Sequence, residues 1–184
     1  MTDLSTPRLL LRRWRQTDRE AFAELNADPI VMEHLHGVMS RSESDDFADK
    51  LDAGFDQHGY GVWAVELPGG AGFIGYTGLA LPAFEAHFMP AVEVGWRFAR
   101  EHWGHGYATE AAQAAVADGF SRVGLNEIVS FTVPANVRSR RVMERIGMTH
   151  DPADDFDHPR FPSGHRLCRH VLYRLKADQW RRQL

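Results

Sequence analysis

Residues 103–108, with the sequence WGHGYA, restrict the fold of this chain more than any other segment. An alternating segment at 91–98 (AVEVGWRF) precedes them, and apolar residues at helical spacing follow over 107–120. The sequence therefore predicts a strand, a glycine turn and a helix in succession. The first turn of a helix offers N–H groups without intrahelical partners, and glycines let a bulky anion approach them closely. The junction favours a phosphate or pyrophosphate ligand, and a tight strand-to-helix connection is the alternative.

Two well-known phosphate-binding motifs do not fit this junction. No third glycine stands at the spacing of the Rossmann fingerprint, and no ribose-binding acid follows a suitable strand. The sequence also lacks the Gly-Lys-Ser/Thr that ends a Walker A loop. The ligand of the glycine turn must therefore be inferred from the rest of the chain.

Hydrophobic periodicity and turn residues divide the remaining chain into strands and helices. We expect strands at 8–14, 60–67, 72–79, 91–98, 127–133 and 168–175, and helices at 16–27, 40–58, 107–120 and 136–146. The polar, proline-containing segment 151–164 is expected to be a long loop. This order is typical of an α/β fold with a mixed sheet, and the lack of a linker or repeat predicts one domain over 1–184.

Length, charge and cysteine content limit the class of protein. The chain of 184 residues is long enough for one well-buried core and short for two domains. Its net charge of −4 gives no electrostatic case for nucleic acid or an anionic membrane as a partner. Cys168 is the only cysteine, which fits a reducing compartment. Because the N-terminal segment contains only a short apolar run, LLL, we expect neither a signal peptide nor a membrane span, and we expect a cytoplasmic protein.

Segment 154–170 (DDFDHPRFPSGHRLCRH) gathers histidines and aspartates late in the chain. It has neither an HExxH motif nor the Cys/His pair spacing of zinc sites, so we expect no metal site. We interpret its DFDHP portion as a loop near the site of a second substrate. His170, within a predicted strand, is interpreted as a packed core residue.

Several segments occur together in a recognisable order: TPRLLLRRW, NADPIVM, VEVGW, WGHGYA, ATEA and VPANVRSRRVMERIGM. In their order and spacing, over roughly residues 6 to 175, they resemble the GNAT superfamily of acetyl-CoA-dependent N-acetyltransferases, in particular its RimJ/RimL-like branch. The pyrophosphate loop of that family reads Gln/Arg-x-x-Gly-x-Gly/Ala. Trp103 stands in place of the usual Gln or Arg, a departure that matters less because the loop binds mainly through its backbone.

The resemblance implies a single-domain fold with a mostly antiparallel sheet, splayed at the cofactor strand and flanked by about four helices. It implies acetyl-CoA as co-substrate, with loop amides on the pyrophosphate and the preceding strand beside the pantetheine arm. Arg141, which clusters with Arg138 and Arg140, is the candidate contact of the 3′-phosphate, and a solvated helix face is the alternative. The resemblance assigns the cofactor to Trp96, Phe98, Trp103, Gly104, His105, Gly106, Tyr107, Ala108, Thr109, Asn136 and Arg141.

Acetyl transfer to nitrogen requires a neutral amine, a polarised thioester carbonyl and a stabilised thiolate. Glu93 is the candidate base, because the family frequently uses a glutamate of this strand; an ion pair with Arg97 is the alternative. Ser139 is the candidate acid near the CoA sulfur, as in RimL-like relatives, and a hydroxyl bonded back to the helix start is the alternative. Asn136 is expected to cap its helix and, from the resemblance, to contact pantetheine.

The resemblance implies an enzyme that moves an acetyl group to a primary amine by direct attack in a ternary complex. The acceptor is a small-molecule amine or a protein N-terminal α-amine, and both remain open. A non-enzymatic acyl-CoA-binding or regulatory module is the alternative, which the presence of Glu93, Asn136 and Ser139 weakens. We expect a monomer or homodimer without nucleic acid or membrane partners.

Overall fold

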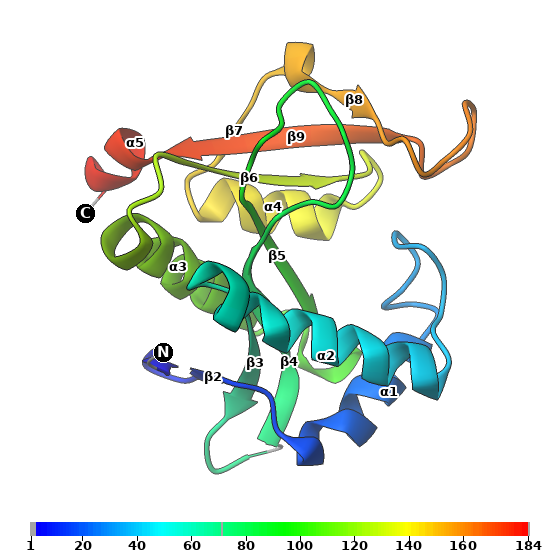
Figure 1. Ribbon diagram of the computed structural model, residues 1–184, viewed down its shortest axis with the longest axis vertical. Helices are drawn as coiled ribbons and strands as arrows, with labels where there is room; N and C mark the ends of the chain where they lie inside the picture. Colours follow the sequence, from blue (N-terminus) through cyan, green and yellow to red (C-terminus); the bar gives the residue numbers. More distant parts are fainter. Residues whose placement is uncertain (1–2, 71, 184) are drawn as a thin grey trace.

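The computed structural model describes residues 3–70 and 72–183 (Figure 1), so both ends of the predicted domain 1–184 lie outside the described part. The strands are β1 (Leu4–Ser5), β2 (Leu10–Arg12), β3 (Val62–Leu67), β4 (Gly72–Ala80), β5 (Glu93–Phe98), β6 (Glu127–Thr132), β7 (Thr149–His150), β8 (Phe156–Asp157) and β9 (Arg169–Lys176). The α-helices are α1 (Arg19–Ala27), α2 (Arg41–His58), α3 (Tyr107–Asp118), α4 (Val137–Arg145) and α5 (Ala177–Arg181). Shorter helical turns are η1 (Gln16–Asp18), η2 (Arg100–His102), the π-helical η3 (Gly119–Val123) and η4 (Pro152–Asp154).

The strands form a mixed sheet in the order β1-β2-β3-β4-β5-β6-β9-β7, with β8 paired to β9. Neighbours are antiparallel except for β5 and β6. β5 pairs with β4 along the whole length of β5, whereas it pairs with β6 only at Glu93, opposite Val129. Figure 1 shows β6 and β9 running across the direction of β3–β5 beyond that point. The structure thus confirms a mostly antiparallel sheet that opens at the predicted cofactor strand.

The two faces of β5 meet different helices, because successive side chains of a strand point in opposite directions. On one face, Val94 and Phe98 belong to a core that includes the alanine-rich side of α3. On the other face, α1 and α2 cover the sheet through a second apolar cluster that includes Phe22, Ala48 and Tyr76. Small alanine side chains let α3 lie close to β4 and β5.

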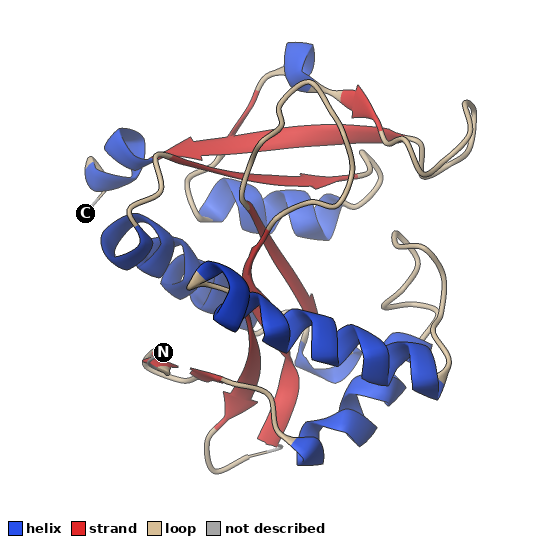
Figure 2. Ribbon diagram, in the orientation of Figure 1, coloured by secondary structure: helices blue, strands red, loops and turns tan. Residues whose placement is uncertain are grey.

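A third apolar cluster covers the β6–β9 half of the sheet. The long connection 81–92 between β4 and β5 passes over these strands, as the tan segment in Figure 2 shows. Its Phe84 and Phe88 contact Phe156 of β8 and Phe131 of β6. These aromatic contacts hold the connection in place, although its sequence shows little hydrophobic periodicity.

Some of the predicted boundaries are wrong. Segment 151–164 is not a continuous loop, because it contains η4 and the strand β8. Phe156 is buried among aromatic rings and pairs with His170 of β9, but an apolar residue alone among aspartates gives no periodic signal. The predicted first strand, 8–14, is shortened to β2, and α5 was not expected.

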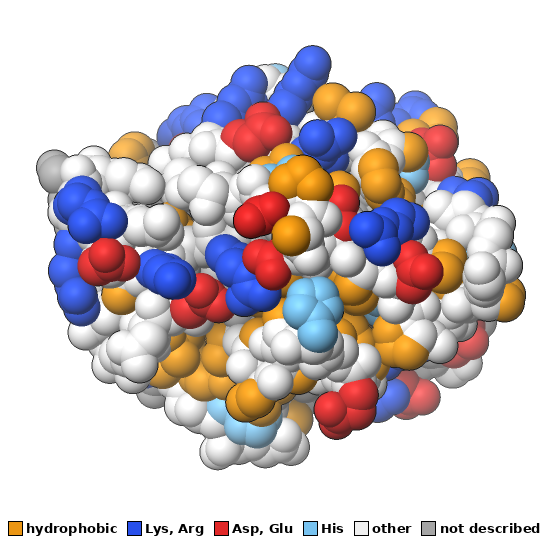
Figure 3. All heavy atoms as spheres, turned by 90° about the horizontal axis from the view of Figure 1, so that it is seen from above, with side chains coloured by type: hydrophobic (Ala, Val, Ile, Leu, Met, Phe, Trp, Pro, Cys, Tyr) orange, Lys and Arg blue, Asp and Glu red, His pale blue; other side chains and the backbone are white. Residues whose placement is uncertain are grey.

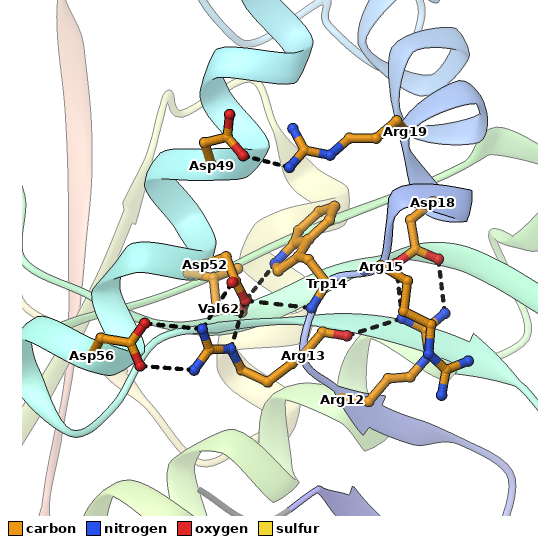
Figure 4. Close-up of polar contacts among 10 residues, drawn as sticks. All are labelled: Arg12, Arg13, Trp14, Arg15, Asp18, Arg19, Asp49, Asp52, Asp56 and Val62. Atoms are coloured by element: carbon orange, nitrogen blue, oxygen red, sulfur yellow. Dashed lines mark hydrogen bonds and ion pairs between the residues drawn. The ribbon is translucent and has the colours of Figure 1, made fainter.

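Arg13, directly after β2, attaches α2 to the sheet (Figure 4). Arg13 donates through Nε and Nη2 to the two oxygens of Asp52, at 2.7 and 2.8 Å, and also contacts Asp56. Trp14 Nε1 donates to Val62 O at 2.7 Å. These contacts hold α2 over the face of the sheet opposite α3.

Basic and acidic side chains are interspersed on the molecular face shown in Figure 3, with apolar atoms between them. Within 3–70 and 72–183, no helix has both the length and the apolarity that a bilayer crossing requires.

Candidate active site

The glycine turn ends in a helix start with exposed backbone donors. Gly104 and Gly106 both have a φ of 81°, and Gly106 is the N-cap of α3 without a side-chain cap. The first intrahelical bond is donated by Glu110 to Gly106 O, so the amides of residues 107–109 have no intrahelical partner. A β-carbon on Gly104 would meet no atom within 4 Å. This open, positively polarised helix end fits an anionic diphosphate.

Trp103 connects three parts of the site. Its Nε1 donates to Phe98 O at 2.8 Å, and the guanidinium carbon of Arg138 lies 4.6 Å from its ring centroid. The indole therefore links the end of β5 to the first turn of α4. Trp103, the residue that departs from the family pattern, thus has a structural role in this protein. Beyond it, the exposed His105 ring stacks on Tyr107 at 5.5 Å.

The N-terminal segment braces the glycine turn. Arg8 donates through Nε to Glu110 Oε2 at 2.6 Å and through Nη1 to His105 O at 2.8 Å. Thr6 Oγ1 donates to Glu110 Oε1 at 2.6 Å. Sequence reasoning missed Arg8, although both segments of this contact, TPR and ATEA, belong to the motifs quoted above. A separation of 102 residues hides the pair from any local pattern.

Glu93 lies where β5 and β6 separate, on the face opposite Val94. It is half-buried, and this burial raises the pKa of its carboxyl to about 8. The alternative interpretation, an ion pair with Arg97, is wrong. No salt bridge of Glu93 occurs among the described residues, and Arg97 Nη1 donates to Asn26 Oδ1 instead. Glu93 is thus a partly desolvated carboxyl without a cationic partner in the part of the chain described.

The start of α4 holds the other predicted polar residues. Asn136 Oδ1 accepts from the Ser139 backbone N–H at 3.2 Å, which confirms the predicted cap, and its Nδ2 donates to Thr132 Oγ1. Ser139 is half-buried, and its hydroxyl has no hydrogen bond to the residues described. The bond back to Asn136 is therefore made by the Ser139 backbone and not by the side chain.

The three arginines of α4 have different surroundings. Arg140 donates to Tyr173 Oη and Pro134 O, and Arg138 lies on Trp103. Arg141 is exposed. A shallow groove of about 410 Å³ beside Gly106 and Thr109 is lined instead by other basic residues, Arg8 and Arg145, together with Pro7, Glu110 and Gln113.

An aromatic and histidine cluster lies on the β8–β9 side. His158 is only 4% exposed, and burial, aided by the charges of His170, His36 and Arg160, lowers its pKa to about 4. His170 is buried in β9, as predicted. Arg166 Nη1 donates to Glu33 O at 2.7 Å, which joins this region to the segment after α1. Across the described residues, no three His, Cys, Asp or Glu side chains are arranged to hold a metal ion.

Comparison with known proteins identifies the family of this chain. Residues 8–149 match the family model of the acetyltransferase (GNAT) domain. Protein YkkB of Bacillus subtilis is 32% identical over 80% of this chain and 85% of its own length. The FsC-acetyl coenzyme A-N(2)-transacetylase of Aspergillus fumigatus is 30% identical over 97% of this chain and 78% of its own length.

Solved structures share the fold. A GNAT-family acetyltransferase from Bacillus anthracis has a TM-score of 0.79 at 27% identity, covering 96% of this chain and 99% of that one. The RimL ribosomal L7/L12 α-N-protein acetyltransferase, solved with CoA, has a TM-score of 0.76 at 17% identity, covering 97% and 99%. The family model spans most of the chain, and two relatives reach 30% identity over most of their lengths. The chain therefore belongs to the GNAT family of acetyltransferases, which use acetyl-CoA.

Proposed function

We propose that this protein transfers an acetyl group from acetyl-CoA to a primary amine by direct attack in a ternary complex. One observation carries the proposal: β5 pairs with β6 only at Glu93, and the helix start that follows β5 presents amides without intrahelical partners. Family membership favours this enzyme over the non-enzymatic module considered above.

The glycine turn and β5 supply backbone groups for the cofactor. The amides of residues 104–109 bind the pyrophosphate, because they lie at a helix N-terminus without intrahelical partners. Beyond Glu93, β6 no longer pairs with β5, so the backbone at Trp96 and the N–H of Phe98, whose carbonyl already accepts from Trp103, are available to an extended pantetheine arm. Asn136, the N-cap of α4, contacts the pantetheine, and the exposed Arg141 is available to the 3′-phosphate.

Glu93 acts as the general base in this proposal. A base is most effective when its pKa lies near the working pH, and burial brings the pKa of Glu93 to about 8. Its position at the end of the β5–β6 opening lets it take a proton from an amine, directly or through a water molecule. Ser139 donates a hydrogen bond to the leaving sulfur, since no described residue takes its hydroxyl hydrogen.

The acceptor class stays open at this level. RimL acts on a protein α-amine, as its name states, and the fungal relative is named as an N(2)-transacetylase for FsC that uses acetyl coenzyme A. We place this chain in the RimJ/RimL-like branch on the order of its motifs, and we infer a cytoplasmic monomer or homodimer. A buried, unpaired cysteine, Cys168, supports a reducing location.

The first test is a calorimetric titration with acetyl-CoA of the wild type, Gly106→Val and Gly124→Val. Both glycines have a φ near 80°, so both substitutions strain the backbone similarly, but Gly124 lies away from the proposed cradle. We expect micromolar binding by the wild type and Gly124→Val, and at least about 30-fold weaker binding by Gly106→Val, a loss of about 2 kcal/mol. Equal binding by all three would refute the cradle. CoA release with an amine panel then tests turnover.

A further inference from the structure

Arg97 is a buried cation without an acidic partner among the described residues. The side chain is 9% exposed and extends from β5 on the same face as Glu93. Its Nη1 donates to Asn26 Oδ1, and its Nε, which is buried, has no hydrogen-bond partner. Asn26 in turn donates to Ser44 Oγ at 2.8 Å, so the groups that orient the guanidinium are neutral. Burying a charge is costly unless an opposite charge or a good hydrogen-bond partner compensates it.

Other arginines of this chain show how such a group is normally satisfied. Arg12, the other buried arginine, contacts Asp18 and Glu66. Arg122 and Arg174 each present the Nε–Nη2 edge to both oxygens of one carboxylate, Asp118 and Asp154 respectively. This planar, two-donor edge matches the geometry of a carboxylate. On Arg97, the Nε of that edge has no hydrogen-bond partner among the described residues, and the neutral hydroxyl of Tyr76 is the group that lies close enough to bond the guanidinium.

The strand between Glu93 and Arg97 leaves room above Gly95, and Tyr76 of β4 lies close enough to both side chains for their charges to act on its hydroxyl. Gly95 lies between them on the same face of β5, and a β-carbon placed on it would meet only Glu93 Oε1, at 3.9 Å. Four residues of strand separate the two Cα atoms by about 13 Å. Phe47 and Tyr76 flank the guanidinium at 5.6 and 5.3 Å without supplying a negative charge. Arg97 and Arg160 are both close enough to His36 for their charges to lower its pKa, after the larger effect of burial. The surroundings of Arg97 therefore favour an anion.

We propose that Arg97 binds a carboxylate of the acceptor, so that the preferred substrates are amines that also carry a carboxylate, such as amino acids. The proposal rests on the proposed acetyltransferase function and assigns its acceptor class. Glu93 faces the amine at one end of the open stretch over Gly95, and the Nε–Nη2 edge of Arg97 receives the carboxylate at the other. Asn26 holds the guanidinium in this orientation and is a positioning residue.

Paired acceptors test the proposal. Glycine, β-alanine, 4-aminobutyrate and L-phenylalanine are compared with their carboxamides, and kcat/KM is divided by the fraction of neutral amine. We expect the wild type to prefer at least one acid over its amide by more than about tenfold, as loss of a charge-assisted contact would give. In Arg97→Gln, this preference is expected to fall to within about twofold, while the KM for acetyl-CoA stays unchanged. Arg97→Lys should recover only part of it, because an ammonium lacks the planar fork.

The control is Arg181→Gln, which makes the same chemical change at an exposed position on α5 and should keep the full preference. Far-UV circular dichroism and acetyl-CoA titration establish that each variant is folded and loaded. If no acceptor turns over, the binding of the same acids to the CoA-loaded proteins is measured by calorimetry. Binding to the wild type that is lost in Arg97→Gln supports the proposal. Absence of binding to the wild type overturns it. Equal use of acids and amides by the wild type, or equal losses on both in Arg97→Gln, would also overturn it. Failure to bind acetyl-CoA would instead count against the proposed function.

Discussion

At the scale of single residues, Glu93 illustrates a conflict between chemistry and stability. Burial raises its pKa from 4.5 to about 8. Between pH 4.5 and about 8, the carboxyl is therefore protonated in the folded state and ionised in the unfolded chain. The contribution of the protonated carboxyl to the free energy of unfolding is fully present below pH 4.5 and is lost as the pH rises through about 8. Glu93→Gln should therefore gain stability relative to the wild type at about pH 9 but little at about pH 4.5, by urea unfolding.

The same substitution should reduce activity. Removing a general base typically costs about 10²- to 10⁴-fold in rate, and we expect kcat/KM to fall within that range. The rise of kcat/KM with pH near 8 in the wild type should also disappear, because the group that titrates there is gone. An unshifted pH–rate profile in Glu93→Gln would mean that another group, or the amine itself, sets the profile.

Ser139 provides a second prediction for a single residue. Ser139→Ala removes a hydroxyl without a hydrogen bond to the described residues, so the fold should tolerate it. We expect kcat to fall by about tenfold or more with unchanged affinity for acetyl-CoA, because the hydrogen bond to sulfur forms as the thiolate leaves. Ser121→Ala, on the exposed part of η3, is the matched control. A loss of less than about threefold, below 1 kcal/mol, would remove Ser139 from the chemistry.

At the scale of elements, the N-terminal segment and α3 act together. Arg8 holds both Glu110 in the first turn of α3 and His105 O in the glycine turn. Arg8→Met should weaken acetyl-CoA binding by about fivefold, about 1 kcal/mol, because the turn loses the contact that orients its amides. Arg15→Met, which removes an exposed arginine from the same part of the chain, should bind as the wild type. Equal affinities for Arg8→Met and wild type would show that the turn holds its shape alone.

Elements with clear periodicity could be predicted from the sequence, and short ones could not. The alternation in 91–98 and the spacing in 107–120 identify β5 and α3, which carry most of the candidate site. β8 and α5 could not be predicted, because segments of two to five residues are too short for a periodic pattern and depend on tertiary contacts. The contacts of Arg8 and Arg97 could not be predicted for a similar reason. Their partners, Glu110 and Asn26, lie 102 and 71 residues away, and only the folded sheet brings them together.

At the scale of the whole molecule, the buried histidines predict acid sensitivity. The pKa of His158 is lowered from 6.5 to about 4, and burial also lowers the pKa of His170. Between 4 and 6.5 the unfolded chain binds protons at His158 that the folded protein does not. The stability from a neutral His158 is thus complete above 6.5 and is lost as the pH falls towards 4. The contribution of the neutral His158 to the free energy of unfolding is about 1–3 kcal/mol.

The test is urea unfolding at about pH 7.5 and about pH 4.5, for the wild type, His158→Phe and His58→Phe. Phenylalanine suits a site whose neighbours are Phe84, Phe156 and Phe161, and it cannot take up a proton. We expect the wild type to lose stability at the lower pH and His158→Phe to lose about 1–3 kcal/mol less. Any pH-independent cost of the substitution cancels in this difference. His58 is exposed at the end of α2, so His58→Phe should lose as much as the wild type. An equal loss in His158→Phe would show that the acid sensitivity comes from other groups.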